Sequence, residues 1–198
     1  MKLDVLVMAA HRDDIEIVCG GTVIKLTDLG YKVGIVDLTE GEMGTRGTEL
    51  DRKREADKAA KVMRIRLREN LSMPDAKVEL SWENKMKVVE VLRKYRPHLL
   101  ILPYWEQRHP DHANCSLLGW DAAFLAGLAK LDEVQGKPHR PFKIIYSTIS
   151  VSDKKPSFIV DITNQFQRKL KAVGCYRSQF YPKKPEGKKI FPPARNIY

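Results

Sequence analysis

Short apolar runs alternate along the chain with amphipathic stretches of helical periodicity. The apolar runs are rich in β-branched residues and leucine and are bounded by polar or turn-forming residues, a pattern typical of strands buried on both faces of a parallel sheet. On this basis we predict strands at 3–10, 32–38, 64–70, 99–102, 143–149 and 157–162.

Helical periodicity fills most of the intervals between these runs. We predict helices at 15–29, 49–63, 82–95 and 164–176. Gly30 suits the end of the first helix, and Pro97 follows the end of the third. Alternating strands and helices joined by right-handed crossovers predict an α/β fold, with a Rossmann-like, doubly wound, mostly parallel sheet flanked by helices. Such sheets bind ligands at the carboxyl ends of their strands, where the strand order reverses.

Composition agrees with a globular protein that lies outside the membrane. The 198 residues are 43% hydrophobic, and no apolar run approaches the length needed to cross a bilayer. The run at 3–10 contains Asp4 and continues into a polar string, so we interpret it as a strand and not as a signal peptide. The three cysteines, Cys19, Cys115 and Cys175, form no C-x-x-C pair, which favours a reducing compartment. We therefore expect a cytoplasmic protein.

The net charge of +10 is concentrated at one end of the chain. Residues 168–198 carry +8, whereas residues 1–167 carry only +2, with 26 basic against 24 acidic residues. The predicted organisation is a single domain at 1–180 followed by a basic tail rich in proline and lysine at 181–198. The aromatic residues of this tail are irregularly placed. A basic-tailed adaptor is thus one hypothesis, but we expect no nucleic-acid partner.

Two short strings combine imidazole and carboxylate groups where an apolar run gives way to a helical pattern. They are AHRDDIE at 10–16 and HPDH at 109–112. Because each follows a predicted strand of one parallel sheet, the fold should place both strings on the same rim. Three such side chains can hold a divalent ion and leave a position open for water, as in catalytic zinc centres. Aspartate clusters also cap helices, but two strings after two strands favour a metal site.

Spacing assigns roles within the first string. His11 and Asp14 are three residues apart at a strand-to-helix turn, so both side chains can face one point. The adjacent side chains of Asp13 and Asp14 must diverge. We therefore assign Asp14 as a metal ligand and Asp13 as the general base that faces the water.

The second string supplies the remaining groups. Pro110 suits the first position of a helix, which leaves His109 on the preceding turn and His112 on the first helical turn. We take His112 as the third ligand and His109 as an imidazolium that stabilises the oxyanion or protonates the leaving amine. Asp111 could orient His109 and hold it charged, or could simply provide a favourable charge at the helix start.

These motifs carry a family resemblance. AHRDDIEIVCGGT, DLTEGEMGTRGTELDRKREADKAAKVM, the MPD at 73–75 and PYWEQRHPDHANC resemble the LmbE-like (PIG-L-type) zinc N-deacetylases, in particular the branch that acts on N-acetylglucosaminyl malate in bacillithiol biosynthesis. The resemblance implies His11, Asp14 and His112 as ligands of Zn²⁺, with Fe²⁺ as the alternative ion. It also implies Asp13 as base and His109 as acid or electrophile, in agreement with the assignments made from spacing.

The resemblance implies more than the residues alone can. It assigns Arg52, Asp75 and Glu42 to the binding of the sugar, and it implies a homo-oligomer, either a trimer or a hexamer. The implied reaction removes the acetyl group from an N-acetylglucosamine conjugate, a small-molecule amino sugar, by metal-activated water. Glycines in the segment 41–47 predict a loop that closes over the sugar or forms an ordinary surface turn.

Two features depart from the family pattern. Arg12 stands where the family usually has proline, which would fix φ at this turn. We expect the Arg12 side chain to point to solvent, with a cation beside the metal as the alternative. Family members usually continue past the position of Tyr198, so we expect either a truncated end or a more open pocket. The alternative function is a catalytically impaired, zinc-binding relative that acts as a sugar- or protein-binding module.

Overall fold

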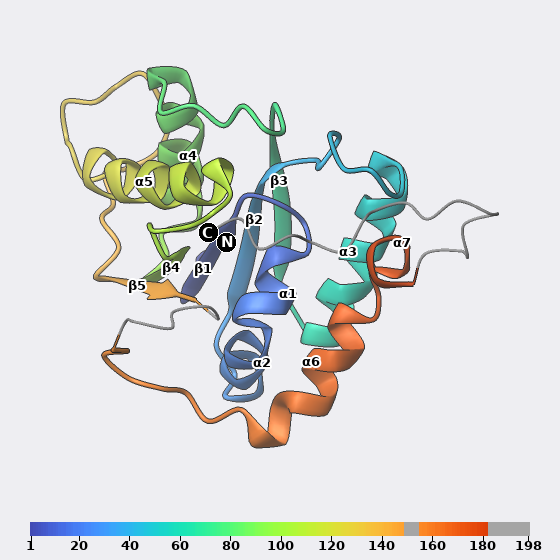
Figure 1. Cartoon of the computed structure of the whole chain (residues 1–198). Helices are drawn as coiled ribbons and strands as arrows, with labels where there is room; N and C mark the ends of the chain where they lie inside the picture. Colours follow the sequence, from blue (N-terminus) through green and yellow to red (C-terminus); the bar gives the residue numbers. More distant parts are fainter. Residues whose placement is uncertain (149–154, 182–198) are drawn as a thin grey trace.

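Five parallel strands form the centre of the molecule. The computed structural model describes residues 1–148 and 155–181. The strands are β1 (Val5–Ala9), β2 (Val33–Thr39), β3 (Leu67–Met73), β4 (Leu99–Pro103) and β5 (Lys143–Ser147). They lie in the order β3-β2-β1-β4-β5, and every neighbouring pair is parallel (Figure 1). The predicted α/β class is confirmed.

Helices cover both faces of this sheet. They are α1 (Asp14–Val18), α2 (Gly20–Asp28), α3 (Glu49–Met63), α4 (Trp82–Tyr95), α5 (Pro110–Leu125), α6 (Phe166–Val173) and α7 (Arg177–Phe180). Helices α4 and α5 pack on one face, and α1, α2, α3 and α6 pack on the other (Figure 1). Within the described part of the chain, the longest helix has 16 residues, and none combines the length and apolarity that a bilayer crossing requires.

The central strands show why their sequences are almost continuously apolar. Every residue of β1 and β2 is buried. Leu6 and Met8 contribute to the cluster under α4 and α5, whereas Val5 and Val7 contribute to the cluster on the opposite face. Because successive side chains of a strand point to opposite faces, a sheet covered on both sides needs apolar residues at nearly every position.

The boundaries of two helices match their prediction from periodicity. Helix α3 spans the predicted residues and begins with a capping box, in which Thr48 and Asp51 each bond the backbone N–H of the other. Helix α4 also matches its prediction, and Ser81 caps its N-terminus. The helix predicted at 15–29 is instead divided at Cys19 into α1 and α2. Strand β3 begins three residues later than predicted because Arg64, with φ of 59°, forms the left-handed cap of α3.

The strand predicted at 157–162 is wrong. These residues form an irregular connection that includes no strand, followed by a 3-10 turn at Thr163–Gln165 and then α6. Phe158 and Ile159 are 58% and 83% exposed, so their apolar character does not reflect burial in the sheet. Residue 149, at the end of another predicted strand, lies outside the described residues, as does the predicted tail beyond Tyr181.

The sheet order places both polar strings at one point. From β1 the sheet extends to β2 and β3 on one side, and to β4 and β5 on the other. The carboxyl ends of β1 and β4 therefore flank the topological switch point, where open α/β sheets bind ligands. His11 lies two residues beyond β1, and His109 lies at the start of α5, in the connection that follows β4.

Candidate metal centre

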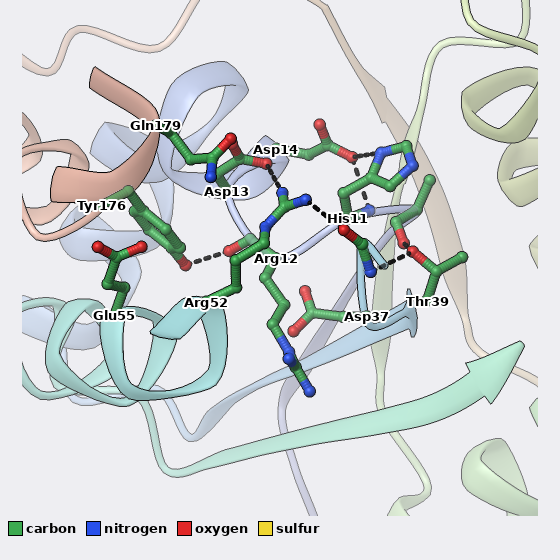
Figure 2. Close-up of polar contacts among 12 residues, drawn as sticks. His11, Arg12, Asp13, Asp14, Asp37, Thr39, Arg52, Glu55, Tyr176 and Gln179 are labelled. Carbon is green, nitrogen blue, oxygen red and sulfur yellow. Dashed lines mark hydrogen bonds and ion pairs between the residues drawn. The ribbon is translucent and has the colours of Figure 1, made fainter. Parts of the chain in front are cut away.

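His11, Asp14 and His112 converge at the switch point. His11 Nδ1 lies 3.2 Å from His112 Nε2, and Asp14 Oδ2 lies 3.4 Å from the first nitrogen and 3.2 Å from the second. One ligand atom from each of the three side chains thus lies within 4.8 Å of the other two. Figure 2 shows the Asp14 carboxylate directed at His11. Two imidazole nitrogens and a carboxylate oxygen are ordinary ligands of Zn²⁺, so this donor set fits a divalent ion.

The charges of this trio favour an ionised carboxylate. Burial is the largest single effect and opposes charge on both His11 and Asp14, but the hydrogen bonds and charges of their partners together outweigh it. Together with Asp75, these contacts raise the pKa of His11 to about 9, and the two imidazoles hold the pKa of Asp14 below its usual range. A metal ion would replace the proton on His11, because only a deprotonated nitrogen can act as a ligand.

Asp13 lies beside His11, Asp14 and His112, but its carboxylate pairs with Arg52. Its Oδ1 accepts a hydrogen bond of 3.3 Å from Arg52 Nη2, and it is not part of either candidate ligand group among the described residues. Burial raises the pKa of Asp13, the charge of Asp14 raises it further, and Arg52 opposes the shift. The two neighbouring carboxylates therefore diverge as expected, and a carboxylate with a raised pKa suits a general base.

His109 stands on the open side of the centre, at the N-terminus of α5. Its ring centroid is 4.9 Å from that of His11 and 5.0 Å from that of His112. Its Nδ1 accepts the backbone N–H of Asp111 at 3.2 Å, and Pro110 occupies the first turn as predicted. An acceptor role for Nδ1 places the proton of the neutral ring on Nε2.

The Asp111 carboxylate bonds the segment that follows β3. It accepts the backbone N–H groups of Ala76 at 2.7 Å and Val78 at 3.3 Å, so it ties the segment after β3 to α5. Burial lowers the pKa of His109, the neighbouring histidines lower it further, and Asp111 opposes this only in part. The backbone N–H of Asp111 thus bonds the His109 ring, and a catalytic role for the Asp111 carboxylate stays a prediction. His11, His109 and Asp111 also form a second possible ligand group.

Asp75 contacts the His11 ring on the side away from Asp14, and Glu42 supports Asp75. Asp75 Oδ1 is 2.9 Å from His11 Nε2, and its Oδ2 accepts the backbone N–H of Met43 at 3.0 Å. Glu42 Oε1 in turn accepts the backbone N–H of Asp75 at 2.6 Å. Carboxylates that bond the far nitrogen of a metal-binding histidine orient its ring. This contact places Asp75 where it can orient the candidate ligand His11. Sugar binding by Asp75 and Glu42 stays a prediction.

Arg52 joins the glycine-rich loop to Asp13. Its Nη1 donates to the carbonyl oxygen of Gly41 at 3.0 Å, while its Nη2 donates to Asp13. Gly41 has φ of +75°, and a Cβ there would lie 2.2 Å from Arg52 Nη1, so the position requires glycine. Further along the loop, Gln179 donates to the carbonyl of Arg46 at 2.7 Å. The loop is thus packed against Arg52 and α7, and sugar binding by Arg52 also stays a prediction.

Arg12 is buried, which corrects the expectation that it points to solvent. The residue is only 4% exposed, and its guanidinium donates to the carbonyl oxygen of Glu49 at 3.0 Å and to Glu40 Oε1 at 3.3 Å. Figure 2 shows the side chain directed away from His11 and Asp14. Acceptors after β2 and at the start of α3 replace water around this cation, so it does not face the metal centre.

A buried polar network beneath the site was missed by sequence reasoning. Arg68 donates to both carboxylate oxygens of Asp37, at 2.7 and 3.0 Å, and to Glu16 Oε1 at 2.6 Å. The hydroxyl of Tyr176 lies 3.0 Å from the same Glu16 oxygen. One signal was available, because Asp37 interrupts an otherwise apolar buried strand.

A recess of about 60 Å³ opens beside Asp14 and His112. Most of its lining is apolar, from β1, α1 and the end of β4. The lining residues are Met8, Ala9, Asp14, Ile15, Val18, Cys19, Pro103, Gln107, His112, Ser147 and Thr148. A small apolar group could enter this recess next to the candidate ligands.

Comparison with known proteins finds a matching family model and relatives of similar sequence. Residues 6–123 match the family model described as PIG-L: GlcNAc-PI de-N-acetylase. A diacetylchitobiose deacetylase of Thermococcus kodakarensis is 34% identical over 190 residues, covering 89% of this chain and 70% of that protein. A probable N-acetyl-alpha-D-glucosaminyl L-malate deacetylase of Bacillus cereus is 28% identical over 197 residues, covering 90% and 84%.

A solved structure shows the same fold. The crystal structure of a conserved protein from Thermus thermophilus has a TM-score of 0.85 and 38% identity, and the match covers 90% of this chain and 80% of that one. The region matched by the family model contains both polar strings and all the residues of the candidate centre.

Proposed function

Because the chain belongs to the PIG-L family of de-N-acetylases, we propose that it is a zinc-dependent hydrolase that removes the acetyl group from an N-acetylglucosamine conjugate. The observation that carries this proposal is the convergence of His11, Asp14 and His112 beside a separate carboxylate, Asp13. Three ligands and a free base are the parts that metal-assisted amide hydrolysis needs.

His11, Asp14 and His112 would hold the ion, with Zn²⁺ as the expected metal and Fe²⁺ as the alternative. When bound, the ion would supply a Lewis acid that polarises a carbonyl and lowers the pKa of water to about 7. Asp75 would keep the His11 ring in its orientation, since it bonds the ring nitrogen that faces away from Asp14.

Asp13 would take the proton of the attacking water. Its hydrogen bond to Arg52 orients the carboxylate, and burial raises its pKa toward the range in which a base is useful. His109 would donate from Nε2, because its Nδ1 is used by the backbone of Asp111. Water adds to the acetyl carbonyl, the C–N bond breaks, and acetate and the free amine leave.

The apolar recess supports an acetyl substrate. Met8, Val18 and Pro103 line it next to Asp14 and His112, so a methyl group could lie there while its carbonyl stays at the centre. The two similar deacetylases are named for diacetylchitobiose and for an N-acetylglucosaminyl malate. We therefore propose an N-acetylglucosamine conjugate as the substrate class, with N-acetylglucosaminyl malate of bacillithiol biosynthesis as one candidate.

The alternative of an impaired, zinc-binding relative loses one of its grounds. Arg12 was the residue that put catalysis in doubt, but its guanidinium is bonded to Glu40 and the backbone of Glu49, away from the trio. A homo-oligomeric state and a cytoplasmic location stay predictions.

The test is acetate release by zinc-loaded protein from a panel of N-acetylglucosamine, diacetylchitobiose and N-acetylglucosaminyl malate. We expect release from at least one conjugate, and its loss in Asp13→Asn at unchanged zinc content. If the zinc-loaded protein binds these sugars in calorimetry but releases no acetate from any of them, the binding-module alternative replaces the enzyme.

A further inference from the structure

The main-chain carbonyl of Arg12 is held by two donors from distant parts of the chain. Arg68 Nη2 and the Tyr176 hydroxyl both donate to this oxygen, from positions 56 and 164 residues away in sequence. Figure 2 shows the contact between Tyr176 and Arg12. Because a carbonyl oxygen has two lone pairs, both of its acceptor positions are used.

The two donors are themselves fixed. Arg68 pairs with Asp37 through two nitrogens and with Glu16 through a third, which leaves its guanidinium a single orientation. The side chains of Arg68, Asp37 and Glu16 are 7%, 2% and 0% exposed. A buried and mutually bonded network of this kind is rigid, because any displacement leaves a buried polar group without a partner.

Tyr176 is also held from outside the network. The segment that follows it donates to Glu55, through the backbone N–H and the hydroxyl of Ser178, both at 2.7 Å. Tyr176 itself is fully buried and packs with Ala56 and Ala59 of α3. The turn between α6 and α7 is therefore anchored on α3. It brings the Tyr176 hydroxyl to the Arg12 carbonyl, in the turn between β1 and α1.

The bonded carbonyl belongs to the peptide unit between Arg12 and Asp13. A peptide unit is planar, so an anchored oxygen also sets the direction of the Asp13 N–H and the path of the chain on either side. Arg12 has no ring that would fix its own φ. His11 precedes this peptide unit, and Asp13 and Asp14 follow it at the start of α1.

We propose that Tyr176 and Arg68 are positioning residues of the metal centre. They hold the Arg12–Asp13 peptide so that Asp14 joins His11 and His112 while Asp13 turns to Arg52. The inference rests on the proposed function for its catalytic consequence, but its consequence for metal binding can be measured without any substrate. It also makes the segment 176–179, beyond the region matched by the family model, a functional part of the site.

The test compares Tyr176→Phe with Tyr95→Phe. Tyr95 is a matched control because it is also buried and its hydroxyl also bonds a carboxylate, that of Glu69, with no contact to the candidate centre. For both variants we would measure the zinc dissociation constant by chelator competition, the absorption spectrum of bound Co²⁺, kcat and KM, and the thermal midpoint.

We expect Tyr176→Phe to weaken zinc binding and to lower kcat, each by about 10-fold, with little change in KM, and to alter the Co²⁺ spectrum. Tyr95→Phe should lose thermal stability yet keep the zinc affinity, spectrum and kcat of the wild type. Arg68→Lys keeps the charge but loses the paired geometry, so it should shift zinc affinity in the same direction. Melting curves establish that each variant is folded.

The outcomes separate this inference from the proposed function. Wild-type zinc affinity, spectrum and kcat in folded Tyr176→Phe would overturn the positioning role, even if the wild-type protein is an active deacetylase. Weakened zinc binding in Tyr176→Phe alone would support the positioning role, even if the wild-type protein releases no acetate. Equal losses of zinc affinity in Tyr176→Phe and Tyr95→Phe would also overturn it, because they would reflect general destabilisation.

Discussion

His11 Nε2 lies 2.9 Å from Asp75 Oδ1, and this contact leaves the other ring nitrogen facing Asp14 and His112. The relationship joins residues that are 64 positions apart in sequence. It links the turn after β1 to the segment after β3, at the rim where the strand order reverses.

Asp75→Asn tests the role of this contact. We expect zinc affinity to fall about 10-fold, because the His11 ring loses the charged partner that orients it. Chelator competition measures the affinity, and steady-state kinetics measures KM in parallel. If KM rises while zinc affinity stays unchanged, Asp75 contacts the sugar and does not support the metal ligand.

Asp13→Asn should keep zinc bound and lower kcat by about 10²- to 10⁴-fold, the usual contribution of a general base. The reason is that Asp13 pairs with Arg52 and lies outside the candidate ligand set. Metal analysis after dialysis and acetate release measure the two properties. Loss of zinc from this variant would mean that Asp13 and Asp14 have exchanged roles.

His112→Ala should lose the metal, because it removes one of three converging donors. His98→Ala is the control, since His98 is exposed and stacks on Phe142. We expect stoichiometric zinc in the control and little in His112→Ala after dialysis against a weak chelator. Full occupancy in His112→Ala would remove this residue from the ligand set and favour the group of His11, His109 and Asp111.

Arg12→Met should lower the free energy of unfolding by about 1–2 kcal/mol, since it removes the hydrogen bonds that the buried guanidinium donates to the Glu49 carbonyl and to Glu40. Zinc affinity should not change, because the guanidinium points away from the trio. Denaturant unfolding and chelator competition measure the two effects. A large change in zinc affinity at unchanged stability would place the Arg12 charge at the metal after all.

Val18→Ala should widen the recess beside Asp14 and His112. We expect the kcat/KM for an N-propionyl substrate, relative to the N-acetyl substrate, to rise about 10-fold, the scale of one methylene in an apolar pocket. Val23→Ala is the control, because Val23 is buried in α2 and does not line the recess. An unchanged ratio in Val18→Ala would show that the acyl group does not enter the recess.

Local chemistry made part of this protein readable from its sequence. Helical periodicity predicted α3 and α4 with their observed bounds, and the structure adds Thr48 and Ser81 as caps that act within one turn of their own helices. The convergence of His11 with His112 was also predictable, since both follow strands of one parallel sheet and such strands end at the same edge.

Other features depended on contacts that no local pattern records. The apolar residues at 157–162 resembled a strand, but strand formation requires pairing with a neighbouring edge, and this segment pairs with no strand of the described sheet. Likewise, the burial of Arg12 depends on acceptors at Glu40 and Glu49, which the packing of α3 brings to it.

The sequence by itself determined the α/β class, the two polar strings and their placement at the ends of β1 and β4. Tertiary structure alone decided that Arg68 and Tyr176 meet at the Arg12 carbonyl, and that Asp75 stands behind His11. The physical reason is range: periodicity and capping act over a few residues, whereas a buried polar group finds its partner only after distant elements have packed around it.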